Sequence, residues 1–351
     1  MRGNILIIVL IFVMLSALVL GGLYLIRAKD KVEIFGLKAP NISIFEPQPT
    51  PFAFQEMTIP YLRNRNYDSR LGELKKYSDN SNYTSYLTSY NSDGLKINGL
   101  LTIPNEKTDD GKYPAIVFVH GYIAPSIYET TERYVDYINY LARNGFVVFK
   151  IDLRGHADSE GEATGSYYSG DYVIDTLNAY SALQNSDFVD KDKIGLWGHS
   201  MAGNIVSRAL AVKPEIPAAA IWAGAGYTYT DLLEYRISDM SYRPPEQNTQ
   251  RAKRRQELRE KYGDFDPNSE FWRQVAPTNY LNDLKGSIAL FHAIDDSVVS
   301  VEYSRNLNNI LNGTNIVHEI HEYSSGGHNI SGSSFSQAMS STVEFFNKHL
   351  K

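Results

Sequence analysis

The sequence Ile194-Gly195-Leu196-Trp197-Gly198-His199-Ser200-Met201-Ala202-Gly203 joins a short apolar run to a turn of small residues around one serine. We expect residues 194–197 to form a strand, and residues 201–212 have the apolar spacing of a helix. A chain that turns this sharply from strand to helix needs small neighbours around the serine and leaves its hydroxyl exposed. Ser200 is therefore a candidate nucleophile, although a serine at the start of a helix can also serve only as its cap.

Strands alternate with helices on both sides of this turn. The predicted strands are residues 83–90, 95–103, 115–119, 146–151, 194–197, 218–222, 287–294 and 316–321. The predicted helices are residues 129–143, 171–183, 201–212, 301–311 and 334–349. This alternation predicts an α/β fold with a mostly parallel sheet that has helices on both faces. Ligands bind such sheets at the carboxyl ends of the strands, so the residues just past each strand are the candidates for function.

Residue types that carry out catalysis follow three of these strands. Ser200 follows one strand, the pair Asp295-Asp296 follows residues 287–294, and a glycine-flanked histidine, His328, lies in the last strand–helix loop. A serine nucleophile needs a histidine that takes its proton and a carboxylate that orients the histidine. We therefore predict Ser200 as the nucleophile, His328 as the base and one of the two aspartates as the acid.

Taken in chain order, these features resemble the α/β-hydrolase superfamily. The turn around Ser200 is similar to its Gly-x-Ser-x-Gly nucleophile elbow, with Ala202 at the second glycine position. The order Ser200, Asp296, His328 is the order of its catalytic triad. Residues 292–299 are similar to the pattern His-Gly-x-x-Asp-x-x-Val, which carries the acid in this family. An ungapped match to that pattern places the acid at Asp296.

The resemblance covers roughly residues 83–351 and also implies an oxyanion hole. In this family a His-Gly turn after a buried strand supplies one backbone donor, and the residue after the nucleophile supplies the other. Here the donors would be the backbone N–H groups of Tyr122 and Met201. Residues 152–161 resemble a family loop that braces the site, and we expect this loop and His120 to be structural.

Within the superfamily, the chain looks most like the catalytic domain of prolyl oligopeptidase-type serine peptidases and related esterases. Residues 276–280, Ala-Pro-Thr-Asn-Tyr, are similar to the Ser-Pro-x-x-Tyr segment that precedes the acid strand there. Those peptidases usually carry a β-propeller ahead of the hydrolase domain, and residues 1–82 are too few for one. The resemblance implies a small-molecule ester or short-peptide substrate, cleaved through an acyl-enzyme, and no cofactor. The choice between a peptidase and a carboxylesterase stays open, and the alternative is a catalytically silent binding module on the same fold.

Composition excludes several other functions. The chain has 34 Lys and Arg residues against 40 Asp and Glu residues, and its net charge of −6 lacks the basic surface of a nucleic-acid-binding protein. It has no cysteine, which excludes a disulfide scaffold, a thiolate zinc site and a catalytic thiol. His318 and His321 are three residues apart on a predicted strand, so they face opposite sides and do not chelate one ion there. We therefore predict no metal site and no nucleic-acid partner.

The N-terminal region carries a long apolar segment. Residues 5–26 contain no charged side chain, and a helix of that length reaches about 33 Å, enough to cross a bilayer. The segment is too long for a cleaved signal peptide, whose apolar region has about 7–15 residues. We predict a single-pass membrane anchor over residues 1–27 that inserts residues 5–26 into the lipid bilayer. A cleaved signal peptide and a buried core helix are the alternatives.

The orientation of this anchor depends on two opposing signals. Basic residues follow the apolar segment at Arg27, Lys29, Lys31 and Lys38, and they favour a cytoplasmic body by the positive-inside rule. The very short tail ahead of the segment is instead typical of anchors that export the rest of the chain. We predict a cell-membrane protein with an extracytoplasmic catalytic domain.

Two further regions complete the predicted domain organisation. Residues 28–82 contain prolines at positions 40, 47, 49, 51 and 60, which favour an extended stalk without helices. The hydrolase domain would then span residues 83–351. Within it, residues 227–286 break the alternation of strands and helices, and we expect this insertion to form a cap over the site that shapes the acyl and leaving-group pockets.

Overall fold

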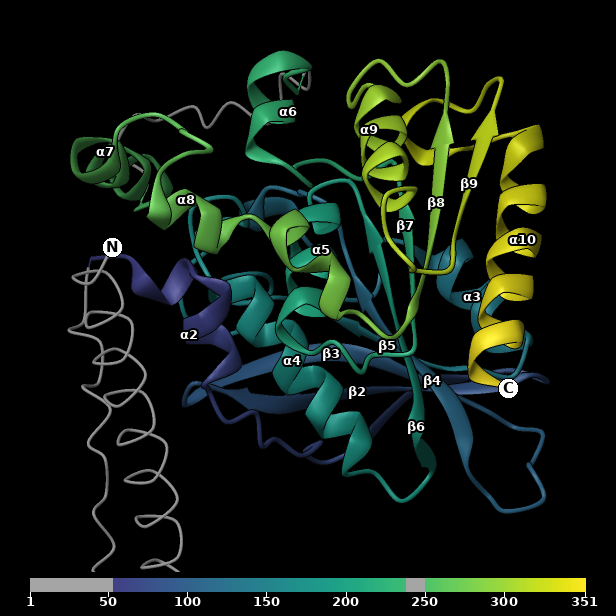
Figure 1. Ribbon diagram of the computed structural model, residues 1–351. Helices are drawn as coiled ribbons and strands as arrows, with labels where there is room; N and C mark the ends of the chain where they lie inside the picture. Colours follow the sequence, from purple (N-terminus) through teal and green to yellow (C-terminus); the bar gives the residue numbers. More distant parts are fainter. Residues whose placement is uncertain (1–52, 238–249) are drawn as a thin grey trace, which may run out of the picture. The chain divides into compact units, whose positions relative to one another are not determined.

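The computed structural model describes residues 53–237 and 250–351, which belong to a compact unit running from Phe52 to Lys351. Their centre is one sheet of nine strands in the order β1-β2-β3-β5-β4-β6-β7-β8-β9 (Figure 1). The predicted anchor, residues 5–26, lies outside the described residues. Across the described ranges, the helices are all too short or too polar to cross a membrane.

The strands form a mostly parallel sheet with an antiparallel edge. Their bounds are β1 Lys75–Asp79, β2 Tyr83–Ser92, β3 Leu95–Pro104, β4 Tyr113–Val119, β5 Val147–Ile151, β6 Val189–His199, β7 Ala218–Trp222, β8 Ser287–Ala293 and β9 His318–Tyr323. Strands β1, β2, β3 and β5 pair antiparallel in that order, and every pair from β5 to β9 is parallel. The sheet predicted from the alternation of strands and helices is confirmed.

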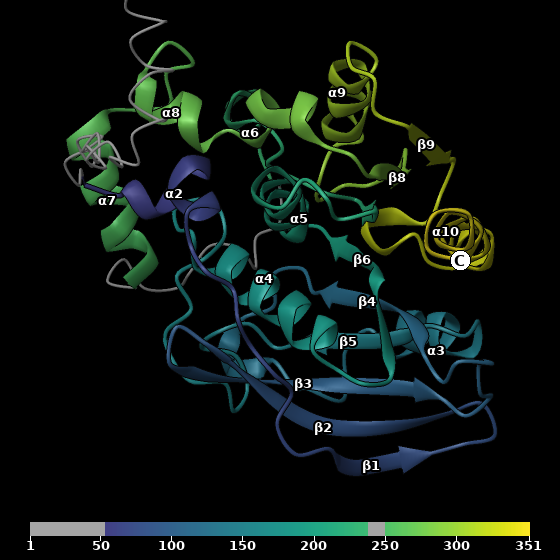
Figure 2. The same cartoon turned by 60° about the horizontal axis from the view of Figure 1, so that its bottom comes forward.

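Helices cover both faces of this sheet, as predicted (Figure 2). The α-helices described are α2 Ile59–Arg63, α3 Val135–Arg143, α4 Asp171–Gln184, α5 Ala202–Val212, α6 Tyr229–Glu234, α7 Gln250–Tyr262, α8 Glu270–Val275, α9 Glu302–Leu311 and α10 Ser333–Leu350. Helices α3 and α10 share one apolar core with the sheet, and α2, α4, α5 and α9 share the other. Strands β4, β5, β7 and β8 are buried along their whole length between these layers, which explains their unbroken apolar runs.

One predicted helix begins later than its sequence pattern indicated. Residues 129–143 have helical spacing, but α3 begins only at Val135. The residues ahead of it form a loop in which the hydroxyls of Tyr128 and Thr130 donate hydrogen bonds to the carboxylate of Asp152, at 2.9 and 2.7 Å. These tertiary hydrogen bonds override the local preference for a helix.

The predicted stalk is too long, because the body already begins near residue 53. Strand β1 pairs with β2, and α2 packs Ile59 and Leu62 fully into the core. Pro60, which the stalk prediction took as a helix breaker, lies in the first turn of α2, where a missing N–H leaves no hydrogen bond unmade. Proline therefore marks the start of a helix here, and the stalk prediction does not hold for residues 53–82.

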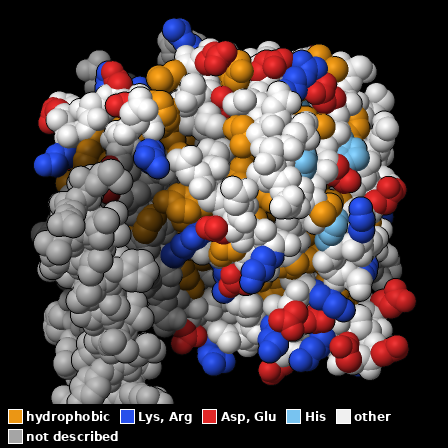
Figure 3. Space-filling model, viewed as in Figure 1, with side chains coloured by type: hydrophobic (Ala, Val, Ile, Leu, Met, Phe, Trp, Pro, Cys, Tyr) orange, Lys and Arg blue, Asp and Glu red, His pale blue; other side chains and the backbone are white. Residues whose placement is uncertain are grey.

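The insertion between β7 and β8 contains α6, α7, α8 and the 3-10 helix η4 Pro277–Asp283. Its aromatic side chains pack on one another: the rings of Tyr262 and Phe271 are stacked, with centroids 3.9 Å apart, and Trp272 lies 5.1 Å from Tyr229. Met57 is buried in the same cluster. On the face shown in Figure 3, basic and acidic side chains are interspersed.

Candidate active site

Ser200 lies between β6 and α5 in a strained backbone conformation. Its φ angle is 57°, in the left-handed region that residues with a side chain rarely adopt. Three backbone hydrogen bonds hold it there: its N–H donates to the carbonyl of Trp222 at 2.9 Å, and its carbonyl accepts from Gly203 at 2.9 Å and from Ala225 at 3.0 Å. The turn therefore has the strained geometry expected of a nucleophile elbow.

The small residues around Ser200 are required by close packing. A Cβ atom added to Gly203 would lie 2.8 Å from the backbone of Gly224 and Ala225, and one added to Gly198 would lie 2.7 Å from a methyl of Val206. Ala202 is fully buried with its own Cβ in place. The departure from the Gly-x-Ser-x-Gly pattern at Ala202 is thus accommodated, because the tight approach falls on Gly203.

The three side chains predicted as nucleophile, base and acid are hydrogen-bonded in one chain. The Nε2 atom of His328 lies 2.8 Å from the Oγ atom of Ser200, and its Nδ1 atom lies 2.8 Å from the Oδ2 atom of Asp296. Ser200 follows β6, Asp296 follows β8, and His328 lies in the 3-10 helix η5, Gly327–Asn329, after β9. The carboxyl edge of the parallel strands therefore brings them together.

The environment of Asp296 keeps its carboxylate ionised. Its side chain is completely buried, and it accepts hydrogen bonds from the N–H groups of Val298 and Val299 at 2.8 and 2.9 Å. The Nε2 atom of His292 lies 3.2 Å from the oxygen that also contacts His328. Burial acts to raise the pKa of Asp296, but the hydrogen bonds with His292, His328 and Val299 outweigh it and hold the pKa well below its usual range. An anionic group beside the imidazole can orient it and stabilise its protonated form.

The neighbouring carboxylate, Asp295, faces a different partner. Its oxygens accept hydrogen bonds from the backbone N–H groups of Gly326 and Gly327, at 3.3 and 2.8 Å. Asp295 therefore holds the loop that carries His328, while Asp296 contacts the imidazole itself. The two adjacent aspartates thus have different partners, and the one that contacts the imidazole is Asp296, the position indicated by the ungapped match.

A cavity of about 560 Å³ opens above Ser200. Its lining includes both residues predicted to form the oxyanion hole, Tyr122 and Met201. The Nδ1 atom of His120 lies 2.6 Å from the carbonyl oxygen of Gly121. Because that carbonyl and the N–H of Tyr122 point in opposite directions across one trans peptide, the contact turns the N–H away from the His120 ring. Met201 stands at the start of α5, where the helix dipole favours negative charge.

The loop predicted to brace the site does so through buried ion pairs and hydrogen bonds. The guanidinium of Arg154 contacts the buried carboxylate of Asp175 at 2.7 Å. The Nδ1 atom of His156 lies 3.2 Å from the carbonyl of Arg154, and burial lowers the pKa of His156 to about 4. These contacts fasten the loop to α4 and to its own backbone, which fits the structural role that we expected for it.

The described part of the insertion contributes little to the cavity wall. Of its described residues, Ile237 lines the cavity, whereas Trp272 is buried in the aromatic cluster with Met57. Much of the remaining wall consists of aromatic and polar side chains from the loop before α3, from Tyr167 and from the start of α10. The prediction that residues 227–286 form both substrate pockets is therefore too broad for the described residues.

Three residues around the site were not predicted from the sequence. His292 contacts Asp296, and His199 and Tyr134 are hydrogen-bonded to each other beside Ser200. A signal was present for His292, because it opens the same pattern from which Asp296 was counted. Tyr134 carries no such signal. Within the two described ranges, there is no group of three or more His, Asp or Glu side chains able to hold a metal ion.

Comparison with known proteins finds similarity to serine peptidases. A family model described as serine aminopeptidase, S33, matches residues 112–261. Dipeptidyl peptidase 8 of Mus musculus is 32% identical over 166 residues, which cover 45% of this chain and 18% of that protein. The uncharacterized peptidase YtmA of Bacillus subtilis is 27% identical over 222 residues, covering 62% of this chain and 76% of that protein. The matched segment is thus a small part of the first relative and most of the second.

Solved structures show the same fold. Acetyl xylan esterase 1 from Thermoanaerobacterium superposes with a TM-score of 0.59 at 20% identity, over 86% of this chain and 95% of that chain. Acylaminoacyl peptidase from Pyrococcus horikoshii superposes with a TM-score of 0.60 at 23% identity, over 77% of this chain and 42% of that chain. The chain therefore has the α/β-hydrolase fold, and its sequence is similar to serine peptidases over part of its length.

Proposed function

We propose that this chain is a membrane-anchored serine hydrolase that cleaves an ester, amide or peptide bond through a Ser200–His328–Asp296 triad and an acyl-enzyme. The observation that carries the proposal is the continuous hydrogen-bond chain from Ser200 Oγ through His328 to Asp296, with both contacts at 2.8 Å. A neutral serine is a weak nucleophile, and an imidazole at this distance is the base that activates it.

The proposed reaction has two halves. Ser200 Oγ attacks the substrate carbonyl while His328 Nε2 takes its proton, and the N–H groups of Tyr122 and Met201 stabilise the negative oxygen that forms. His328 then gives the proton to the leaving alcohol or amine, and the acyl group stays on Ser200. In the second half, His328 takes a proton from water, the hydroxide attacks the acyl carbonyl, and Ser200 leaves with the proton returned. Asp296 stabilises the imidazolium in both halves.

A short substrate is supported by the size and lining of the cavity. About 560 Å³ holds a small ester or a short peptide, and the wall carries the aromatic residues Tyr122, Tyr137, Tyr167 and Phe335. Peptidases and esterases both stand among the similar proteins. Both bond types therefore belong to the proposal.

The test combines a covalent probe with substrate turnover. A fluorophosphonate probe should label the wild-type chain and leave Ser200→Ala unlabelled. Hydrolysis should then be measured across a panel of p-nitrophenyl acyl esters and aminoacyl anilides, with Ser200→Ala as the control. A folded wild-type chain that neither reacts with the probe nor hydrolyses any member of the panel would contradict the proposal and would favour a silent binding module.

Anchoring is the second part of the proposal and is supported by the uncharged segment at residues 5–26. The full chain should sediment with membranes, and a chain that starts at residue 53 should be soluble and equally active, because the compact unit begins at Phe52. Protease added to intact cells should remove the body from an extracytoplasmic face. Protection until the cells are lysed would place the body in the cytoplasm, and a processed soluble chain beginning near residue 27 would exclude the anchor.

A further inference from the structure

A buried histidine directly precedes the nucleophile and has a partner on each ring nitrogen. His199 precedes Ser200 and is 3% exposed. Its Nδ1 atom lies 2.8 Å from the hydroxyl of Tyr134, and its Nε2 atom lies 2.9 Å from the carbonyl oxygen of His328. The side chain at this position of the elbow therefore contacts the backbone of the residue that acts as the proposed base.

The partners allow only one arrangement of protons. Burial, together with the nearby His328, lowers the pKa of His199 to about 3, so the ring is neutral and carries one proton. The carbonyl of His328 can only accept, so the proton is on Nε2 and Nδ1 is an acceptor. Tyr134 then donates its hydroxyl proton to Nδ1. The same hydroxyl accepts the backbone N–H of Gly121 at 2.9 Å.

These contacts form one directed chain of hydrogen bonds. It runs from the N–H of Gly121 through the Tyr134 hydroxyl and the His199 ring to the carbonyl of His328. Its first residue precedes Tyr122, a proposed oxyanion donor, and its last residue is the proposed base. The chain thus connects the loop after β4 with the loop after β9, on opposite sides of Ser200.

The residues of this hydrogen-bond chain are closely packed. A Cβ atom added to Gly121 would lie 2.9 Å from the Tyr134 hydroxyl and 3.0 Å from both Nδ1 of His199 and Cβ of Ser200. The Tyr134 ring is held edge-on against Phe118, with centroids 5.3 Å apart. Tyr134 also has a φ angle of 63°, so its backbone is strained in the position that delivers the hydroxyl.

We propose, on the basis of the function proposed above, that Tyr134 and His199 are positioning residues that fix the oxyanion loop and the base loop relative to each other around Ser200. They act through the backbones of Gly121 and His328. Removing a link lets the two loops move independently. The loss then falls on the chemical step, because the oxyanion donors and the base must be aligned together in the transition state.

The first test removes single links. Tyr134→Phe deletes one oxygen and should lower kcat about tenfold while KM changes less than about twofold. His199→Phe should have a similar effect, and His199→Gln, which keeps one donor and one acceptor, should recover part of the loss. The double variant Tyr134→Phe/His199→Phe should lose little more than either single variant, because both break the same chain.

Two controls show whether a change in kcat comes from the hydrogen-bond chain itself. Tyr83→Phe removes a hydroxyl that contacts Asn139 of α3, the helix that begins after Tyr134, and should leave kcat unchanged. Thermal unfolding of each variant checks that it folds, and Tyr134→Phe preserves the test if His199→Phe does not fold. An inactive wild-type chain would contradict the proposed function. If the wild type is active, three results would overturn this inference: an unchanged kcat in Tyr134→Phe, a rise in KM alone, or additive losses from the two substitutions.

Discussion

The two sides of the catalytic cavity are built in different ways. On the side of β8 and β9, side chains hold one another directly: Asp296 contacts His328, and His328 contacts Ser200. On the opposite side, the wall that carries Tyr167 is held through its backbone by two arginines from elsewhere in the chain. Arg208 donates to the carbonyls of Ser166 and Ser169 at 3.2 and 2.6 Å, and Arg254 donates to the carbonyl of Tyr168 at 2.8 Å.

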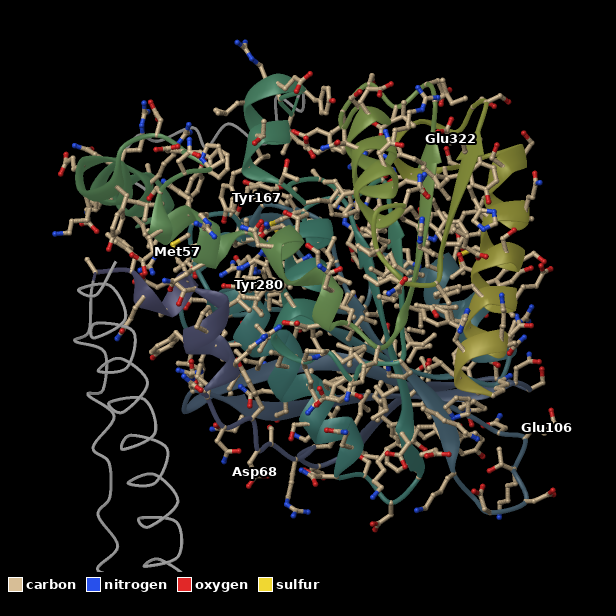
Figure 4. The ribbon with its side chains drawn as sticks, in the orientation of Figure 1. Met57, Asp68, Glu106, Tyr167, Tyr280 and Glu322 are labelled. Carbon is tan, nitrogen blue, oxygen red and sulfur yellow. The ribbon has the colours of Figure 1, made fainter. Side chains whose placement is uncertain are left out.

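The arginine-held side is also connected to residues 53–63, which we call the N-terminal segment of the body. Arg208 donates to the carbonyl of Met57 at 2.5 Å, and Arg254 pairs with Glu56. One buried arginine, Arg208, thus contacts the backbone of Met57 and the backbone on either side of Tyr167; Met57 and Tyr167 are labelled in Figure 4. We expect the β8–β9 side to determine the rate of the chemical step and the arginine-held side to determine substrate fit and stability.

The largest expected effect is on the β8–β9 side and compares its two adjacent aspartates. Asp296→Asn should lower turnover by about four orders of magnitude, because an amide does not stabilise the imidazolium and favours the wrong tautomer of His328. Asp295→Asn should keep at least about a tenth of the activity, because an amide oxygen can still accept the N–H of Gly327. Steady-state turnover of both variants, with circular dichroism as the folding control, measures the difference. A folded but inactive Asp295→Asn variant, beside an active Asp296→Asn variant, would show that Asp295 is the acid.

The next effect is on stability and concerns the arginine-held side. Arg208→Met leaves the carbonyls of Ser166, Ser169 and Met57 without this donor and should cost about 2–4 kcal/mol of unfolding free energy. KM should rise while kcat stays within about threefold, because the triad does not share these contacts. Urea unfolding and steady-state kinetics test both parts.

A matched control for Arg208→Met is Arg63→Met. Like Arg208, Arg63 donates to a backbone carbonyl, that of Ala211 in α5 at 2.8 Å, but Arg63 is partly exposed. Its replacement should cost less stability and leave KM unchanged. A fall in kcat at constant KM in Arg208→Met would show that the two sides of the cavity are not independent.

The sequence was sufficient to predict the residues that lie at strand ends in a fixed order. Ser200, Asp296 and His328 each lie in a loop that leaves a strand of the sheet, so the apolar runs that define the sheet also locate these side chains. Strand β1 could not be predicted in the same way. Its residues Lys75–Asp79 are all exposed at the edge of the sheet, so no apolar periodicity marks them.

Contacts between residues far apart in the chain could not be predicted from the sequence either. Tyr134 meets His199 across 65 positions of the chain, and neither residue belongs to a local pattern that indicates the other. The wall of the cavity depends on such contacts too, since Arg208 lies on α5 and Met57 belongs to the N-terminal segment. A single sequence carries the periodicity of each element, whereas these pairings are fixed only when the elements pack.

A smaller effect is on the pH dependence of stability, in which the buried carboxylates Asp231 and Asp296 differ. Burial raises the pKa of Asp231 to about 6, against an ordinary value of 3.8, although Asn306 donates to it at 2.7 Å. Its folded-state pKa is therefore shifted in the opposite direction from that of Asp296. The folded state holds the Asp231 proton to higher pH than the unfolded chain does, so stability is present at low pH and is lost as the pH rises from about 4 through 6.

Asp231→Asn removes this loss while its amide oxygen still accepts from Asn306. The variant should be more stable than the wild type by about 1–3 kcal/mol at pH 8 and should gain much less at pH 4. Unfolding free energies of both proteins at the two pH values measure the difference. An equal difference at both pH values would mean that ionisation of Asp231 does not contribute.

The smallest expected effect tests whether the N-terminal segment influences the cavity through Arg254. Arg254→Ala removes the hydrogen bond to the Tyr168 carbonyl and the ion pair with Glu56, whereas Glu56→Gln weakens the ion pair and leaves the Tyr168 contact. Because the pair is partly exposed, Glu56→Gln should cost no more than about 0.5 kcal/mol of stability and leave KM unchanged. Arg254→Ala should raise KM for the bulkier substrates by about twofold to threefold, since the backbone beside Tyr167 loses a donor.

Kinetics on a series of esters with growing acyl groups separates the two variants. Equal KM changes would mean that the N-terminal segment itself shapes the cavity, and no change in either would leave Arg208 as the contact that holds this wall.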